Sequence, residues 1–154
     1  LVDENGTGKK EAEFYQSQWK DKLGIDVEVE VLTKKERIAR AKAGEFEIVR
    51  YAWGPDYADP MTYLEIFHSK AKDINFAKYT DSKYDELIDL AKVNQDNKTR
   101  MDAMKQAEKL LSDDFTYSAL YYEVGVYLIN PKLKGVVIRS VGDSIDFYNA
   151  SITK

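Results

Sequence analysis

Cysteine is absent from the 154-residue chain, which excludes disulfides, thiolate metal ligands and a cysteine nucleophile. Histidine is represented by His68 alone, so a histidine-rich metal site is excluded as well. No apolar run approaches the roughly 18 residues that a membrane-spanning helix needs. No glycine-rich phosphate loop follows a predicted strand. From these absences we expect no metal and no cofactor.

Charge of one sign is not concentrated in any part of the chain. Lys and Arg number 23 against 27 Asp and Glu, which gives a net charge of -4. Because phosphate binding needs a clustered excess of basic residues, we expect no nucleic-acid partner. Hydrophobic residues make up 44% and charged residues 32%, a balance typical of a soluble globular domain with its own core.

Hydrophobic periodicity in the first third of the chain predicts an α/β fold. Apolar and acidic residues alternate over 25–32, which predicts a strand. Thr33 and Glu36 form a capping box that begins a helix, and Gly44 ends it. The apolar run 46–53 is the next predicted strand. Strand, helix and strand together predict a βαβ unit whose two strands pair in parallel.

The rest of the chain is predicted to have a helical middle and a β-rich C-terminal end. Helical spacing and capping residues indicate the helices, and β-branched and aromatic runs indicate the strands. The first expected helix covers 9–23 and is ended by Gly24. Three further helices are expected to begin at Asp59-Pro60, at Ser82 with Asp85 in a capping role, and at Asn97. The expected loop is 69–80, and the expected strand runs are 117–130, 136–141 and 145–149.

The run from Trp53 to Leu64 (WGPDYADPMTYL) follows a predicted strand, and loops in that position hold ligand contacts in α/β folds. Asp56 lies there between the aromatic residues Trp53 and Tyr57. A carboxylate so placed suits an ammonium group, since such a bond contributes about 1.5–3 kcal/mol and the rings add cation–π attraction. The alternative is that Asp56 bonds the backbone of its own turn.

Asp59 precedes Pro60, which favours a helix-capping role. Asp56 and Asp59 together could serve as the acid and base of a glycosidase, but no other residues complete a catalytic set. We therefore expect a protein that is not an enzyme. His68 follows a predicted helix, where we expect it to cap the helix or lie on the surface.

Arg50 lies in an otherwise apolar predicted strand. A cleft-lining or buried arginine needs a carboxylate partner. That partner is either an internal Asp or Glu or the carboxylate of a ligand. Trp53, at the end of the same strand, is either a core residue or the wall of a pocket.

The run Trp53–Leu64 resembles the signature loop of the oligopeptide-binding proteins of ABC transporters, which are family 5 extracellular solute-binding proteins. The flanking segments are similar to the same family over about residues 9 to 150. They are AEFYQSQW at 12–19, LGIDV at 23–27, LYYE at 120–123 and NPKLKG at 130–135.

The resemblance implies an α/β lobe of the periplasmic-binding-protein type (class II, cluster C), with a βαβ unit, a helical middle and a β-rich C-terminal end. It implies that residues 1–154 are a single fragment, the later part of the second ligand-binding lobe of a larger two-lobed receptor, running to the C-terminus. The other lobe, a signal peptide and, in Gram-positive members, a lipid anchor would lie outside this chain. The expected location is the extracellular face of the cell membrane or the periplasm, with membrane attachment only through that anchor.

The resemblance also implies a function and its residues. The receptor captures oligopeptides as a monomer and delivers them to ABC permease subunits. Asp56 matches the aspartate that binds the peptide α-ammonium, Trp53 matches the aromatic beside it, and Tyr57 flanks it. Arg50 matches a basic position near the carboxylate end of the ligand in some short-peptide binders. The alternatives are a relative that carries nickel, haem, a sugar or a signalling peptide.

Overall fold

The computed structural model describes residues 1–4, 6–142 and 144–153. They form two compact units, which we describe separately. The N-terminal unit comprises Leu1–Ala52 and Phe67–Thr80, and the helical unit comprises Trp53–Ile66 and the residues from Asp81 onward. The prediction that the whole chain belongs to one lobe stays a prediction.

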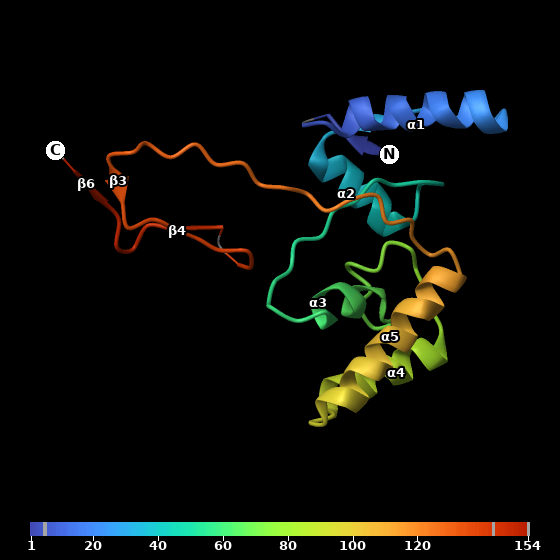
Figure 1. The fold of residues 1–154 in the computed structure, drawn as a ribbon. Helices are drawn as coiled ribbons and strands as arrows, with labels where there is room; N and C mark the ends of the chain where they lie inside the picture. Colours follow the sequence, from blue (N-terminus) through green and yellow to red (C-terminus); the bar gives the residue numbers. More distant parts are fainter. Residues whose placement is uncertain (5, 143, 154) are drawn as a thin grey trace. The chain divides into compact units, whose positions relative to one another are not determined.

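The N-terminal unit contains a parallel βαβ unit, but not the predicted one. Strand β1 (Val2–Asp3) leads through helix α1 (Gly8–Leu23) to strand β2 (Val31–Leu32), and the two strands pair in parallel with Val2 opposite Val31. Figure 1 shows α1 and, after it, helix α2 (Lys34–Ala43). Of the predicted strand 25–32, only the last two residues are a strand.

The predicted pairing of 25–32 with 46–53 is wrong because the first residues of the chain lie between them. The Leu1 amino group donates to the Ile48 carbonyl at 2.6 Å, and the Arg50 N–H donates to the Leu1 carbonyl at 3.0 Å. On the other side, the Val2 N–H donates to the Glu30 carbonyl at 3.0 Å. Residues 48–50 and β2 therefore flank the same short strand, and 46–53 itself is not a strand and bends at Glu47.

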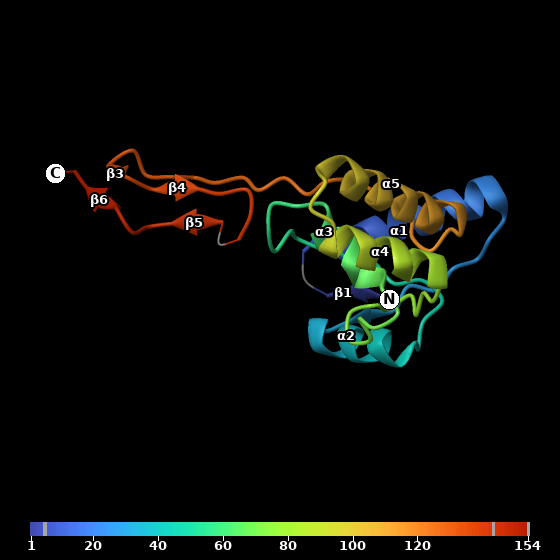
Figure 2. The same ribbon diagram turned by 90° about the horizontal axis from the view of Figure 1, so that it is seen from below.

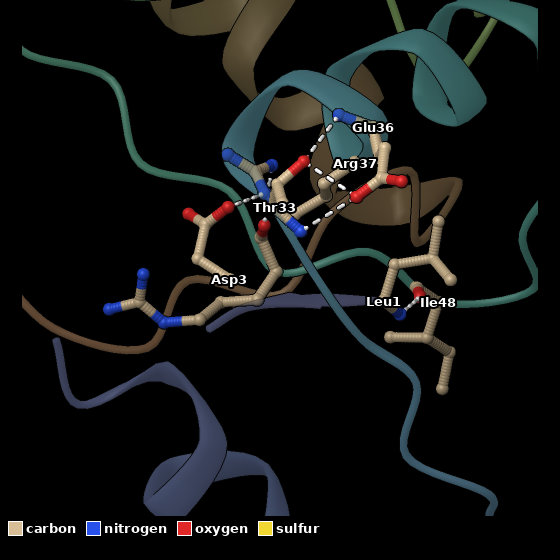
Figure 3. A network of polar contacts seen from close by, with 7 residues as sticks. Leu1, Asp3, Thr33, Glu36, Arg37 and Ile48 are labelled. Carbon is tan, nitrogen blue, oxygen red and sulfur yellow. Dashed lines mark hydrogen bonds and ion pairs between the residues drawn. The ribbon is translucent and has the colours of Figure 1, made fainter. Parts of the chain in front are cut away.

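Local sequence signals set the ends of the helices in this unit. The capping box of α2 is confirmed, since the Glu36 N–H donates to the Thr33 hydroxyl and the Thr33 N–H donates to the Glu36 carboxylate (Figure 3). Gly24 and Gly44 end α1 and α2 with φ of 69° and 79°, a left-handed conformation that glycine adopts without steric cost. The predicted helix 9–23 is thus confirmed within one residue.

The helical unit contains the short helix α3 (Met61–Leu64), the first two residues of the 3₁₀ turn η1 (Glu65–Phe67), and the long helices α4 (Ser82–Val93) and α5 (Asn97–Asp113). Figure 2 shows α4 and α5 side by side. Apolar residues at helical spacing fill the space between these elements. The buried ones are Met61, Leu64, Ile66, Tyr84, Ile88, Ala91, Ala103, Met104, Ala107 and Leu111.

The long helices begin where the sequence predicts, but each is capped by the residue before. The Asp81 carboxylate accepts from the Tyr84 N–H at 2.6 Å, so Asp81 and not Ser82 caps α4. Asp96 likewise accepts from the Thr99 N–H at 2.8 Å and caps α5. Aspartate and serine both provide an oxygen that accepts from the amides of the first turn. In each helix the aspartate that precedes the first helical residue is the one in position to do so.

The β-rich C-terminal end is confirmed only in part. Strand β3 (Leu133–Lys134) pairs with β6 (Ser151–Ile152), and β4 (Val137–Ile138) pairs with β5 (Ile145–Asp146), both antiparallel. The predicted strand 117–130 is drawn in Figure 2 without a strand arrow. Its side chains are exposed, Tyr122 by 94%. A strand needs a paired neighbouring strand, and the strand pairs of the described residues join β1 with β2, β3 with β6 and β4 with β5, outside this segment.

Candidate ligand-binding site

Backbone N–H groups of the loop from Trp53 to α3 donate hydrogen bonds within the loop and to the first turn of α3. The Asp56 N–H donates to the Thr62 hydroxyl at 3.1 Å, and the Asp59 N–H donates to the Tyr57 carbonyl at 2.8 Å. Thr62 is only 1% exposed, so its hydroxyl is a fixed point. The loop and the first turn of α3 therefore form one connected piece of backbone.

Asp59 has a structural role, as its position before Pro60 predicts. Its carboxylate accepts from the Met61 N–H at 2.9 Å and from the Arg100 guanidinium of α5 at 2.6 Å. The assigned helix begins at Met61, one residue later than predicted. The hydrogen bond from Arg100 lowers the pKa of Asp59, with a smaller effect from the Met61 amide. The stabilisation is thus complete at neutral pH and is lost as the pH falls through this lowered pKa.

Glu65 is held by two donors. The Tyr57 hydroxyl donates to one of its carboxylate oxygens, and the Lys92 ammonium of α4 lies 3.0 Å from the other. Burial alone would raise the pKa of Glu65, but the hydrogen bonds from Tyr57 and Lys92 outweigh it, and the net shift is downward. Burial and the same hydrogen bond raise the pKa of Tyr57, so its hydroxyl remains a donor at neutral pH.

Hydrogen bonds and ion pairs fix α3 to the two long helices. The hydroxyl of Tyr84, a residue with no exposed surface, donates to the Leu64 carbonyl at 2.6 Å. Together with Arg100 on Asp59 and Lys92 on Glu65, this bond ties the loop and α3 to α4 and α5. The short helix thus owes its position to tertiary contacts more than to its own four residues.

Asp56 differs from the other two carboxylates of this region. It is exposed, and within the described residues its carboxylate is in no ion pair and accepts no hydrogen bond from its turn. Asp59 and Glu65 are each neutralised by a basic residue of the same unit. The site therefore presents one uncompensated negative charge to solvent, at the position that the sequence singled out.

Two aromatic residues lie beside this carboxylate in the sequence and in the same unit. Trp53 is half-buried and Tyr57 is 39% exposed. Each thus keeps part of its ring accessible to solvent or to a ligand. Their roles at a ligand stay predictions.

Arg50 belongs to the N-terminal unit, whereas Trp53, Asp56 and Tyr57 belong to the helical unit. Its Nε lies 2.6 Å from a carboxylate oxygen of Glu11 on α1, and the two side chains are 22% and 19% exposed. Of the two alternatives from the sequence, the structure thus supplies the internal partner. A role for Arg50 at the carboxylate end of a ligand stays a prediction.

Replacing Arg50 by Met distinguishes a structural pair with Glu11 from a role at the carboxylate end of a ligand. We expect the free energy of unfolding to fall by about 1 kcal/mol, because the half-buried Glu11 carboxylate loses its ion pair with Arg50. If the pair with Glu11 is the whole role of Arg50, the peptide binding that the resemblance implies should show the same ratio of affinities for a free and an amidated C-terminus in both proteins, as titration calorimetry with the two peptides would measure. A loss confined to the free-carboxylate peptide would place Arg50 at the ligand.

His68 does not lie on the surface, one of the two expected places. It is only 4% exposed, and its Nδ1 accepts from the Lys70 N–H at 3.0 Å. It therefore fixes the turn that follows η1, which is a structural role.

Among the described residues, no group of three or more His, Asp and Glu side chains is placed to hold a metal ion. None of the helices described is long and apolar enough to cross a membrane.

Comparison with known proteins identifies the family. Residues 1–75 match the bacterial extracellular solute-binding proteins, family 5 middle region. The chain is 36% identical over 134 residues to the dipeptide-binding protein DppE of Bacillus subtilis, which covers 87% of the chain and 24% of DppE. It is also 30% identical to the periplasmic oligopeptide-binding protein OppA of Haemophilus influenzae, over the whole chain and 29% of OppA.

Solved structures agree with the sequence comparison. The substrate-binding domain of an oligopeptide ABC transporter from Bacillus anthracis superposes with a TM-score of 0.85 at 30% identity, over 99% of this chain and 31% of that one. Haemophilus influenzae OppA in complex with the peptide RPPGFSPFR gives a TM-score of 0.82 at 29% identity, over 95% of this chain and 29% of that one.

The chain thus belongs to the family 5 extracellular solute-binding proteins, and its fold is the mixed α/β fold of the periplasmic-binding-protein type, as predicted. It spans about a quarter of the length of the curated relatives that it matches, for example 24% of DppE and 26% of Bacillus subtilis OppA. Members of this family are extracellular or periplasmic proteins that bind solutes.

Proposed function

We propose that this chain is part of the solute-binding component of an ABC importer that captures oligopeptides and delivers them to permease subunits. The α-ammonium group of the peptide binds Asp56, and Trp53 and Tyr57 line that position. The observation that carries the proposal is the exposed Asp56 carboxylate, which forms no ion pair within the described residues. The nearby carboxylates of Asp59 and Glu65 each form an ion pair with a basic residue.

The chemistry of this arrangement favours a positively charged ligand group. A carboxylate without an internal cation gains a charge-assisted hydrogen bond when an ammonium group arrives, and partial burial by two rings strengthens it. Relatives support a peptide as the source of that group, since one is named a dipeptide-binding protein and another is solved with RPPGFSPFR. Residues 1–154 would then be part of the second lobe of a two-lobed receptor.

We further propose that the protein has no catalytic activity. A glycosidase would need both Asp56 and Asp59 as acid and base. Asp59 pairs with Arg100 and accepts from the Met61 amide, which supports a structural role instead. The receptor would act as a monomer at the extracellular face of the membrane, held by a lipid anchor, or in the periplasm.

Titration calorimetry on the full-length protein tests the proposal. We expect short peptides with a free amino terminus to bind with micromolar or tighter affinity, and their N-acetylated forms to bind at least ten times more weakly. Nickel, haem and oligosaccharides should give no heat of binding. Tight binding of one of these, with no binding of peptides, would instead show a receptor for that other cargo.

A further inference from the structure

The Asp56 side chain is exposed, so its position depends on its backbone. Within the described residues its carboxylate has no ion pair, whereas its N–H donates to the Thr62 hydroxyl at 3.1 Å. Thr62 is 1% exposed although it carries a polar group. A threonine so placed provides a hydrogen-bond acceptor inside the protein, directed at the residue that carries the charge.

The Thr62 hydroxyl is itself held in place. The Thr62 N–H donates to the Asp59 carbonyl at 3.2 Å, and the Asp59 carboxylate is bound by Arg100 at 2.6 Å. Two residues further on, the Leu64 carbonyl accepts from the buried Tyr84 hydroxyl at 2.6 Å. A continuous series of hydrogen bonds thus runs from the two long helices through α3 to the Asp56 amide.

We propose that Thr62 is a positioning residue that holds the Asp56 carboxylate where it meets the ammonium group of a ligand. This inference rests on the proposed function. A charge-assisted hydrogen bond depends steeply on distance and angle, and a group fixed before binding loses less freedom when the ligand arrives. Removing the acceptor frees the Asp56 backbone without altering any group that touches the ligand.

Two substitutions of Thr62 in the full-length protein test this role. Thr62→Val keeps the shape but removes the acceptor, and Thr62→Ser retains the hydroxyl. We expect Thr62→Val to weaken peptides with a free amino terminus about 5- to 10-fold and to leave the affinity for their N-acetylated forms unchanged. Thr62→Ser should restore most of the loss, and the Asp56 amide should exchange its hydrogen faster in the Val variant alone.

A double variant distinguishes positioning from a general loss of structure. In the presence of Asp56→Asn, Thr62→Val should weaken binding no further, because the charge that it positions is gone. Equal weakening of free and acetylated peptides would show a merely structural role and overturn the inference, as would an unchanged affinity for free-amine peptides. If Asp56→Asn alone has no effect, the proposed function fails instead, whatever Thr62→Val does.

Discussion

Replacing Asp56 by Asn in the full-length protein should weaken peptides with a free amino terminus by about 10- to 100-fold, as titration calorimetry would measure. A hydrogen bond between charged groups is worth about 1.5–3 kcal/mol net, and each 1.4 kcal/mol corresponds to a factor of ten in affinity. Asparagine has nearly the same shape, so the exposed loop should keep its backbone bonds to Thr62. The loss then reports the charge alone.

The peptide series and a charge-matched variant control this experiment. N-acetylated peptides lack the ammonium group, so the substitution should hardly change their already weak binding. Glu86→Gln removes one negative charge from an exposed position of α4 in the same unit, and we expect less than a twofold effect from it. Equal affinity of Asp56→Asn and the parent protein for free-amine peptides would remove Asp56 from the site.

The helices could be predicted from the sequence because their signals are local. The capping box of Thr33 and Glu36 and the glycines that end α1 and α2 act within a few residues, and each is found where the sequence places it. Even the misassigned cap of α4 is an error of one residue, from Ser82 to Asp81. Capping and periodicity involve residues that are close together in the chain, so both can be recognised in a single sequence.

The strands could not be predicted as well because their partners are distant. Residues 25–32 and 46–53 have strand-like patterns, yet the pairing depends on Leu1 and Val2, whose short segment carries no periodic signal. Residues 117–130 have the composition of a strand, but composition cannot supply a hydrogen-bonding neighbour. Pairing is set by tertiary context, which outweighs β-propensity.

In the candidate site too, local features could be predicted from the sequence and contacts between distant residues could not. The position of Asp56 after a predicted strand and between two aromatics could be seen in the sequence. That Asp59 and Glu65 are neutralised, and Asp56 is not, could not be seen, because Arg100 and Lys92 lie 41 and 27 positions further along the chain. Thr62 could not be singled out either, since a threonine in a short helix gives no sequence signal that its hydroxyl accepts from the Asp56 N–H.

The buried arginine of α2 is the residue of the N-terminal unit whose loss should destabilise the protein most. The Arg37 side chain is 5% exposed, and its Nε lies 2.7 Å from the Asp3 carboxylate of β1 (Figure 3). Its Nη1 donates to the Arg50 carbonyl at 3.1 Å, and its guanidinium carbon lies 5.4 Å from the centre of the Tyr51 ring. One side chain thus joins α2, β1 and the 48–50 segment.

Replacing Arg37 by Ala should lower the local stability of this unit by about 3 kcal/mol, since breaking a buried ion pair leaves Asp3 without its cation. Hydrogen exchange of the full-length protein measures this directly. The Val2 and Glu4 amides, which bond the Glu30 and Leu32 carbonyls, should exchange about 100-fold faster. Arg37→Lys should recover only part of the protection, because an ammonium group cannot bond Asp3 and the Arg50 carbonyl in the same fork geometry.

Arg40→Ala is the matched control for this experiment. Arg40 lies on the same helix and pairs with Glu30, but both side chains are much more exposed, by 33% and 46%. Exposed ion pairs contribute little because water screens them and their side chains lose entropy, so the two amides should stay nearly as protected as in the parent protein. If Arg37→Ala and Arg40→Ala speed exchange equally, the stability of this unit does not depend on the buried guanidinium, and the packing around Val2 and Ala41 must hold β1 in place instead.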